Sequence, residues 1–339
     1  MIAQELIDTS EAMIIGDKGL LAMDESNPTC NRRFAMFGIP QTEEARRTYR
    51  ELLVTTPDIG SCISGAILSD ETIHQNAMNG ISFVDILTGK GILVGIKVDQ
   101  GAKKMAGFPG ERITDGLDGL RKRLAEYNRL GARFAKWRAV FTIGSGIPTD
   151  ACIEANAHAL GRYAALCQEG GLVPIVEPEV LMNGTHTIDR CSKETEKVLQ
   201  ALFNQLYKQR VNLRGIILKP NMILPGKDCP EQHDPVSVAA ETINCFLEAV
   251  PAAVPGIAFL SGGQSAEQAS ARLNAMHVNY NKKVPWAITF SFARAIQQPA
   301  MEIWNGHKEN VQAAQQALYH RASCNNAARR GEYSTAMEF

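Results

Sequence analysis

The segment Arg214-Gly-Ile-Ile-Leu-Lys-Pro-Asn221 is an apolar run that ends on a charged side chain, Lys219. The aliphatic residues before the lysine are typical of a buried strand, and Pro220 cannot continue a central sheet, so we expect the strand to end at Lys219. A buried strand seldom carries a lysine unless its amine is paired or takes part in chemistry. Because burial lowers the pKa of an ammonium group, it makes a neutral, nucleophilic amine available. The segment therefore predicts a strand that ends in a reactive lysine, although a buried Lys–Glu pair would give the same pattern.

Seven further short apolar runs resemble this one, each bounded by turn residues or by a polar end. The eight runs are Gly19–Asp24, Cys62–Ser69, Ile92–Asp99, Gly131–Arg138, Leu172–Glu179, Gly215–Lys219, Gly256–Gly263 and Trp286–Ser291. Segments with helical periodicity lie between most of them, such as Leu117–Leu130, Ile153–Cys167, Glu194–Tyr207 and Val236–Ala249. A repeated strand-then-helix order implies a parallel sheet with right-handed crossovers. Eight such units predict an α/β protein with a (β/α)8 TIM barrel.

A doubly wound sheet is the competing fold for this pattern. It would normally show a glycine-rich G-x-G-x-x-G turn after the first strand. Here the first strand is followed by Asp24-Glu-Ser-Asn-Pro28, which has no such turn and favours the barrel. We expect one domain over residues 1–330 and a mobile C-terminal tail over residues 331–339, because the tail lacks periodicity.

Composition excludes several classes of protein. The formal net charge is −1, which gives no reason to expect nucleic acid as a partner. No apolar stretch approaches the roughly 20 residues that a membrane span needs, and the start Met-Ile-Ala-Gln-Glu-Leu has no secretory pattern. The eight cysteines include no C-x-x-C pair, which indicates free thiols in a reducing compartment. The seven histidines are scattered, so the sequence predicts neither a metal site nor a cofactor.

The carboxyl ends of the predicted strands carry many charged residues. They are Asp24, Lys97, Asp99, Lys136, Arg138, Glu177, Glu179 and Lys219. Catalytic groups of a barrel gather at these ends, and residues two apart on a strand point to the same face. A purely structural ion-pair network is the alternative, but burying so many charges for structure alone is costly. As chemistry, Lys219 would attack a ketone, Lys136 would lower its pKa and the carboxylates would move protons.

Two groups of residues could bind anions on either side of the lysine. Ser261-Gly-Gly-Gln-Ser265 precedes a helical segment, where backbone N–H groups can approach an anion, and Arg294 follows the eighth strand. Barrels often bind phosphate with the loops after strands seven and eight. The second group consists of Ser26, Thr29, Arg33 and Lys97. Two such sites suit a ketose with a phosphate at each end.

The chain resembles the class I fructose-bisphosphate aldolase family in order and spacing from about residue 3 to residue 330. The segments that carry the resemblance are Leu21-Ala-Met-Asp-Glu-Ser26, Gly95-Ile-Lys-Val-Asp99, Gly131-Ala-Arg-Phe-Ala-Lys-Trp-Arg138, Val173-Pro-Ile-Val-Glu-Pro-Glu179, Leu218-Lys-Pro-Asn221 and Phe259-Leu-Ser-Gly-Gly-Gln264. The first of them resembles the plastid-type branch. The resemblance implies metal-independent cleavage of fructose 1,6-bisphosphate, a homotetramer, and a location in the cytoplasm or the plastid stroma.

The resemblance also implies roles for single residues. Lys219 forms the Schiff base, Glu177 is the acid–base residue and Asp24 contacts the substrate hydroxyls and the imine. The charged neighbours of the lysine are Lys136, Glu179 and Arg138. The site for the C1-phosphate consists of Ser261, Gly262, Gly263, Ser291 and Arg294. The site for the other phosphate consists of Ser26, Thr29, Arg33 and Lys97.

Three positions depart from the pattern of the family. Gln100 stands where the family usually has a lysine, and Arg32 stands where lysine is expected before Arg33. The family ends in a tyrosine assigned to proton exchange at C3, but this chain ends in Phe339, and Tyr333 resembles part of the hinge before the tail. We therefore expect Tyr333 to be an ordinary surface group and the tail to have little catalytic role.

Two other functions remain open at the level of the sequence. A transaldolase-like transferase would also use a Schiff base in a barrel, but the paired phosphate sites argue against it. A non-catalytic scaffold would have lost Lys219, Glu177 or Asp24, and all three are present. Sedoheptulose 1,7-bisphosphate offers the same two phosphates as the fructose compound and stays a plausible substrate.

Overall fold

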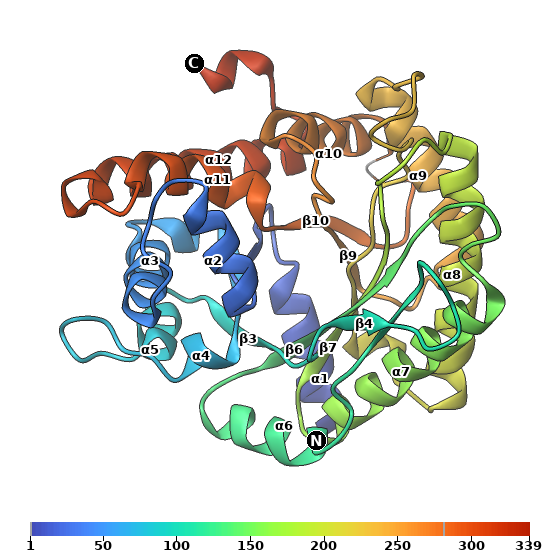
Figure 1. Cartoon of the computed structure of the whole chain (residues 1–339), viewed down its shortest axis with the longest axis horizontal. Coiled ribbons are helices and arrows are strands. Elements are labelled where there is room, and N and C mark those ends of the chain that lie inside the picture. The colour runs from blue at the N-terminus through green and yellow to red at the C-terminus, as the bar shows by residue number, and fades with distance from the viewer. Residues whose placement is uncertain (1, 281) are drawn as a thin grey trace.

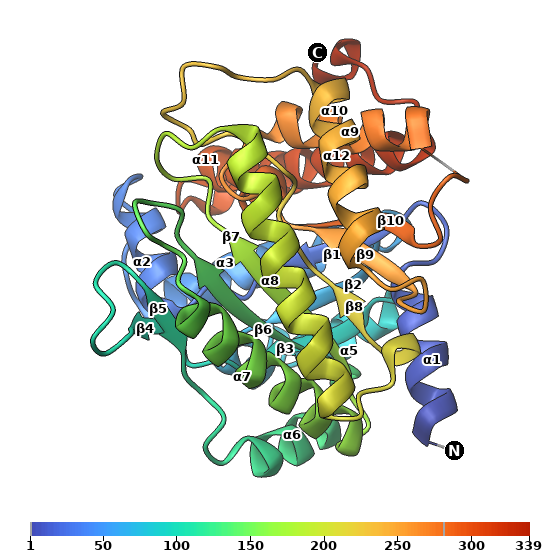
Figure 2. The same ribbon diagram turned by 90° about the vertical axis from the view of Figure 1, so that its right-hand side faces the viewer.

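The computed structural model describes residues 2–280 and 282–339 and contains a closed barrel of parallel strands (Figures 1 and 2). Around the barrel the strand order is β1, β10, β9, β8, β7, β6, β3 and β2, and β2 pairs with β1 to close it. The eight strands are β1 Gly19–Ala22, β2 Ile63–Leu68, β3 Leu93–Lys97, β6 Phe134–Phe141, β7 Val173–Val180, β8 Ile217–Leu218, β9 Gly256–Phe259 and β10 Ala287–Phe292. Each overlaps one of the eight predicted runs, but β6 continues to Phe141, so Lys136 and Arg138 lie within this strand and not at its carboxyl end as predicted. The predicted (β/α)8 barrel is confirmed.

Helices surround the barrel (Figure 2). They are α1 Ile2–Met13, α2 Asn27–Ala35, α3 Glu43–Thr55, α4 Asp70–Ile73, α5 Phe83–Gly89, α6 Leu120–Arg129, α7 Asp150–Glu169, α8 Ile188–Lys208, α9 Pro235–Ala249, α10 Ala266–Tyr280, α11 Arg294–Trp304 and α12 Val311–Arg330. Several begin at a side-chain cap, as at Thr149 and Asp234, whose oxygens accept from the first free N–H groups of the helix. None of the described helices is both long and apolar enough to span a bilayer.

A small antiparallel hairpin interrupts the strand-then-helix order after β3. It consists of β4 (Ala102–Lys104) and β5 (Arg112–Thr114), with Ala102 paired to Thr114. The hairpin and α2 lie at the same end of the barrel, on the left of Figure 2. This is the end at which the parallel strands finish, so the hairpin extends the wall around the carboxyl ends of the strands.

The inward-facing side chains of β6 and β7 change from apolar to charged along each strand. In β7, Val173 and Ile175 belong to the apolar cluster of the interior, and the next residues on the same face are Glu177 and Glu179. In β6, Phe134 of the same apolar cluster is followed on its face by Lys136 and Arg138. The lower half of the barrel is therefore a packed apolar core, and the upper half is a layer of charged side chains.

The C-terminal segment packs against the outer helices. Tyr333 is 7% exposed, its backbone N–H donates to Asn274 Oδ1 at 3.0 Å, and its hydroxyl donates to Glu338 Oε1 at 2.6 Å. Glu338 also accepts from the buried Arg321. Tyr333 is therefore not the ordinary surface group that the sequence led us to expect, because these partners bury it. The mobility of residues 331–339 stays a prediction.

The packing of Phe134 gives a test of the barrel core. A Cβ atom on Gly95 of β3 would lie 2.0 Å from the Phe134 ring, so the strand tolerates only glycine there. We expect Gly95→Ala to lower the free energy of unfolding by about 1–3 kcal/mol, because the ring must move out of a packed interior. Urea denaturation of both proteins measures this difference.

Gly89, at the end of α5, is the matched control. A Cβ atom there would meet no atom within 4 Å, so Gly89→Ala should be neutral or stabilising by up to ~1 kcal/mol. Equal denaturation midpoints for Gly95→Ala and the wild type would contradict the packing described.

Candidate active site

Four buried charged residues, from β6, β7 and the segments that follow β1 and β8, meet at the top of the apolar core. The Lys136 amine lies 2.8 Å from Asp24 Oδ2 and 2.8 Å from Glu177 Oε2. Glu177 Oε1 lies 3.4 Å from the Lys219 amine. All four residues are at most 7% exposed. The structure thus brings together the predicted nucleophile, the second lysine and two of the predicted carboxylates.

The strands account for this arrangement. Lys136 and Glu177 lie on the neighbouring strands β6 and β7, on the inward face that their apolar predecessors occupy lower down. Lys219 directly follows the two-residue strand β8, and its N–H still donates to Val176 O at 2.8 Å. The strand ends at Leu218, one residue before the end at Lys219 that the sequence predicted.

Burial and charge set the protonation of this cluster. Burial lowers the pKa of Lys219, Glu177 opposes that shift, and the like charge of Lys136 adds to it. Burial would raise the pKa of Asp24, but the positive charges of Lys136 and Lys219 outweigh it and lower the pKa to about 2. The same balance lowers the pKa of Glu177. At neutral pH both carboxylates are therefore ionised beside an amine that loses its proton more readily than usual.

Two further ion pairs lie beside this cluster of four residues. Arg138 Nε lies 2.5 Å from Glu179 Oε2, and the Lys97 amine lies 2.7 Å from Asp99 Oδ1. Asp99 also accepts from the backbone N–H groups of Arg138, at 3.2 Å, and Gly101, at 3.1 Å. These contacts hold the segment after β3 against the middle of β6.

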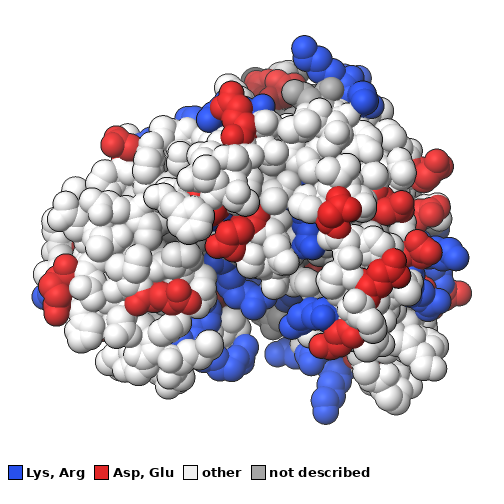
Figure 3. Space-filling model, turned by 90° about the horizontal axis from the view of Figure 1, so that it is seen from above, with Lys and Arg blue, Asp and Glu red and all other residues white. Residues whose placement is uncertain are grey.

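A cavity of about 950 Å3 opens above this cluster. Eight basic and five acidic side chains line it, although the whole chain carries a net charge of −1. Figure 3 shows lysine and arginine side chains gathered around a hollow at the lower edge of that view. An excess of positive charge in a concave site attracts anionic ligands.

The basic residues of the cavity fall into two kinds. Four of them are paired with carboxylates: Lys97, Lys136, Arg138 and Lys219. Four others form no ion pair with any residue that the structure describes: Arg32, Lys103, Arg112 and Arg294. The unpaired cations are available to an anionic ligand.

The first predicted phosphate site is assembled beside Arg294, at the start of α11. Ser261, Gly262, Ser291 and Arg294 all line the cavity. The Ser291 hydroxyl is buried and has no hydrogen-bond partner among the described residues, so it is free for a ligand. Gly262 and Gly263 have φ angles of +59° and +98°, which turn the backbone ahead of α10. Gly263 lies against the Arg294 guanidinium rather than in the cavity lining.

The second predicted phosphate site is only partly assembled. Ser26, Thr29 and Lys97 line the cavity, but Arg33 does not. The Arg33 guanidinium is buried, pairs with Glu25 at 2.5 Å and also donates to glutamine side chains of α11. A phosphate contact by Arg33 stays a prediction that this geometry does not support.

Sequence reasoning missed three cationic residues of this site. Arg32 lines the cavity in place of its neighbour and donates to Thr29 Oγ1 at 3.1 Å. Lys103 and Arg112 reach the cavity from the β4–β5 hairpin. No motif marks a short hairpin of this kind. Adjacent residues on a helix point in different directions, so Arg32 and Arg33 of α2 cannot both face the cavity. This rule could have identified Arg32 as the alternative to Arg33.

Comparison with known proteins shows the family of the chain. A model of the family "Fructose-bisphosphate aldolase class-I" matches residues 5–338. The chain belongs to this aldolase family. It is 53% identical to a "Probable fructose-bisphosphate aldolase class 1" of Xanthomonas axonopodis pv. citri, over 98% of this chain and 99% of that protein. It is 48% identical to "Fructose-bisphosphate aldolase 1, chloroplastic" of Chlamydomonas reinhardtii, over 99% of this chain and 88% of that one.

The fold has a close counterpart among the solved structures of aldolases. A fructose-bisphosphate aldolase from Plasmodium falciparum, crystallised with TRAP and a small-molecule inhibitor, superimposes with a TM-score of 0.96. That chain is 43% identical, and the match covers 98% of this chain and 96% of that one. Family membership and the aldolase barrel, both inferred from sequence motifs, are confirmed.

Lys136 gives a test of the charge balance in this aldolase. We expect Lys136→Met to lower the free energy of unfolding by about 3–5 kcal/mol at neutral pH, because two buried carboxylates lose their shared partner. The deficit should narrow as the pH falls from about 7 to about 4, since those carboxylates then take up protons. Denaturation at a series of pH values measures both effects.

The direction of this pH dependence follows from the pKa of Asp24. In the wild type its pKa is depressed to about 2, so its contribution is present at neutral pH and is lost only as the pH falls toward that value. Arg121 is the control, because its pair with Glu169 is exposed and Arg121→Met should change stability little. If Lys136→Met lowers the free energy of unfolding by the same amount at every pH, Lys136 does not stabilise the ionised carboxylates as described.

Proposed function

We propose that this protein catalyses the reversible cleavage of fructose 1,6-bisphosphate to dihydroxyacetone phosphate and glyceraldehyde 3-phosphate. The observation that carries the proposal is the buried Lys219 amine, with a lowered pKa and an ionised Glu177 at 3.4 Å, beneath a positively charged cavity. A nucleophilic amine and a carboxylate in contact are what Schiff-base chemistry requires. Membership of the class I aldolase family supports the same reaction.

The geometry supports a role for each residue of the cluster. Glu177 accepts the proton of the Lys219 ammonium, which leaves the amine free to attack the C2 ketone. Glu177 can return that proton to the hydroxyl that leaves as water when the imine forms. The protonated imine draws electrons from the C3–C4 bond, and Glu177 takes the proton of the C4 hydroxyl as the bond breaks. The products are an aldehyde and an enamine on Lys219.

The remaining charged residues position this pair. Lys136 keeps Asp24 and Glu177 ionised and stays charged itself, because the two carboxylates raise its pKa despite burial. Asp24 can then contact substrate hydroxyls and the imine. Glu179 and Arg138 form the outer ion pair beside the cluster.

Two groups of residues in the cavity, each with at least one unpaired cation, suit two phosphates. Ser261, Gly262, Gly263, Ser291 and Arg294 would hold the C1-phosphate. Ser26, Thr29, Arg32 and Lys97, together with the hairpin residues Lys103 and Arg112, would hold the other phosphate. Sedoheptulose 1,7-bisphosphate presents the same two groups and would be accepted as well.

The finer features of the protein are proposals too. A homotetramer is supported by the family and by exposed apolar side chains on the adjacent helices α8, α9 and α10, namely Tyr207, Leu247 and Val278. A cytoplasmic location, or the plastid stroma, is supported by relatives described as cytosolic in Arabidopsis thaliana and as chloroplastic in Chlamydomonas reinhardtii. We also propose that residues 1–330 form the barrel domain and residues 331–339 its tail.

Lys219 gives the direct test of the reaction. Borohydride added with dihydroxyacetone phosphate should reduce an imine and add mass at Lys219 only. Lys219→Ala should lose at least about a thousandfold in kcat, or ~4 kcal/mol in the barrier, since no other group supplies the electron sink. Peptide mass mapping and a cleavage assay measure the two effects. Labelling of Lys136 instead would disprove the assignment.

The hairpin cations give a test of specificity. The double variant Lys103→Ala/Arg112→Ala should raise KM for fructose 1,6-bisphosphate by about tenfold, equivalent to about 1.4 kcal/mol, because unpaired charges at the rim are lost. The KM for fructose 1-phosphate should change little, since that sugar lacks the second phosphate. Steady-state kinetics with both sugars separate the two effects.

Lys104 is a matched control on the same hairpin. It is exposed, neighbours Lys103 and does not line the cavity, so Lys104→Ala should leave both KM values unchanged. An equal rise in KM for both sugars in the double variant would show that the hairpin acts on something other than the second phosphate.

A further inference from the structure

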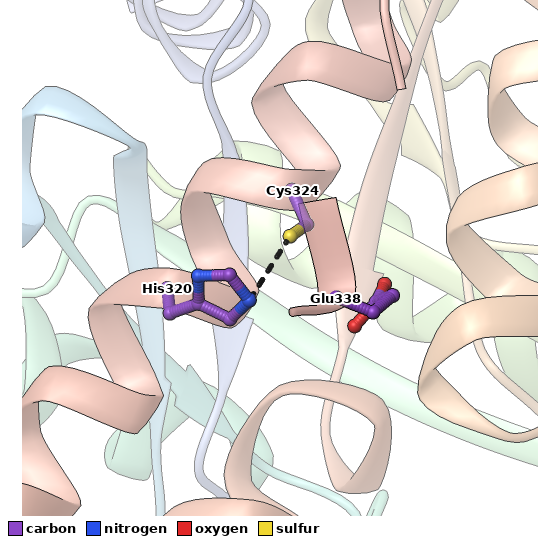
Figure 4. A group of neighbouring side chains, drawn as sticks. All are labelled: His320, Cys324 and Glu338. Atoms are coloured by element: carbon purple, nitrogen blue, oxygen red, sulfur yellow. Dashed lines mark hydrogen bonds between the residues drawn. The ribbon is translucent and has the colours of Figure 1, made fainter. Parts of the chain in front are cut away.

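Helix α12 and the C-terminal segment bring together three side chains of the kinds that bind transition metals. They are His320, Cys324 and Glu338, shown in Figure 4. His320 and Cys324 lie one turn apart on α12, with the imidazole directed at the sulfur, and Glu338 approaches from the tail. Their ligand atoms all lie within 4.8 Å of one another.

The spacing of the first two residues suits a tetrahedral ion. With a zinc–sulfur bond of about 2.3 Å and a zinc–nitrogen bond of about 2.0 Å, tetrahedral geometry sets the sulfur and nitrogen roughly 3.5 Å apart. His320 Nε2 lies 3.6 Å from Cys324 Sγ. Two ligands four residues apart on a helix are also the spacing that helical zinc motifs use. The Glu338 carboxylate lies within 4.8 Å of both other ligand atoms, so a small movement of this side chain completes the set.

We propose that His320, Cys324 and Glu338 bind a Zn2+ ion, which joins the C-terminal segment to helix α12. A water molecule would take the fourth position. Imidazole, thiolate and carboxylate are the ligands that zinc accepts, whereas calcium and magnesium prefer oxygen alone. The thiolate and the carboxylate carry two negative charges, which equal the charge of the ion, and Arg321, which pairs with Glu338, adds one positive charge beside the site.

Residues around the cluster already hold its third ligand in place. Glu338 accepts from the Tyr333 hydroxyl at 2.6 Å and from Arg321, which Ser270 binds in turn at 2.9 Å. A carboxylate has enough lone pairs to keep both hydrogen bonds and bind an ion. Partners of this kind orient metal ligands and are part of most metal sites.

The exposure of the cluster and the protonation of the Cys324 thiol are also compatible with a bound ion. The His320 side chain is exposed, so an ion can enter from solvent, whereas Cys324 is buried. Burial raises the pKa of the Cys324 thiol, and the charge of Arg321 works against that rise. A bound divalent ion deprotonates a thiol that it coordinates.

This site is separate from the chemistry of the barrel. None of its three residues lines the cavity above Lys219. The imine on Lys219 would supply the electron sink, so cleavage should continue in EDTA whether or not the tail site is occupied. The two proposals can therefore fail independently.

Metal binding itself is the first test, with Zn2+ and with Co2+ as its spectroscopic substitute. The purified protein, treated with chelator and then dialysed, should bind one Zn2+ per chain by calorimetry. Co2+ should give a thiolate-to-metal charge-transfer band. His320→Ala and Cys324→Ser should each weaken Zn2+ binding by at least about tenfold, and Cys324→Ser should abolish the band.

Two control variants match these changes elsewhere in the chain. His307→Ala removes another exposed histidine, and Cys229→Ser alters another buried cysteine, and both should bind Zn2+ as the wild type does. No stoichiometric Zn2+ binding by the wild type, or equal affinity in His320→Ala, would overturn the proposal.

The second test is whether the ion attaches the C-terminal segment to helix α12. Glu338→Gln should keep the cobalt charge-transfer band but weaken Zn2+ binding by about tenfold. Zn2+ should slow removal of the C-terminal residues by carboxypeptidase in the wild type but not in Glu338→Gln. The tail variant Glu332→Gln should behave like the wild type, because Glu332 pairs with Arg330 outside the cluster. Digestion at the same rate with and without Zn2+ would show that the ion does not hold the tail.

Discussion

The contact on which the active site depends is the one between the Lys136 ammonium and two carboxylates, Asp24 and Glu177, at 2.8 Å each. Without that charge, the carboxylates could not stay ionised in a buried layer. Without those carboxylates, a second buried ammonium beside Lys219 would be too costly to keep. The cluster is therefore a single electrostatic unit, in which each charge stabilises the ionised form of the side chains next to it. One amine in it, Lys219, has its pKa lowered.

The barrel makes this unit possible by dividing its interior into two halves. Along β6 and β7, the same inward face carries apolar residues first and charged residues afterwards. The apolar half stabilises the fold, and the charged half is stabilised by its own pairing. Cations that are not paired lie in the cavity lining, where an anionic ligand can reach them. Folding and binding thus use different parts of the same strands.

Much of this could be predicted from the sequence, since the strands and the charges at their ends are local patterns. Lys219, Glu177 and Asp24 were found because each ends or directly follows an apolar run. The direction of a helical side chain is harder to predict, and so Arg33, which lies against Glu25, was chosen over Arg32. The burial of Tyr333 was missed because its partners are Asn274 and Glu338, and the first is distant in sequence. The grouping of His320 with Glu338 also depends on how the tail folds back.

Phe134 has a consequence for the path of molecules through the barrel. Its ring fills the space beside Gly65 and Gly95, and the residues around it form a packed floor beneath the charged layer. No ligand can cross such a floor, so entry and exit share one opening. Both products of cleavage must therefore leave through the same opening by which the substrate entered.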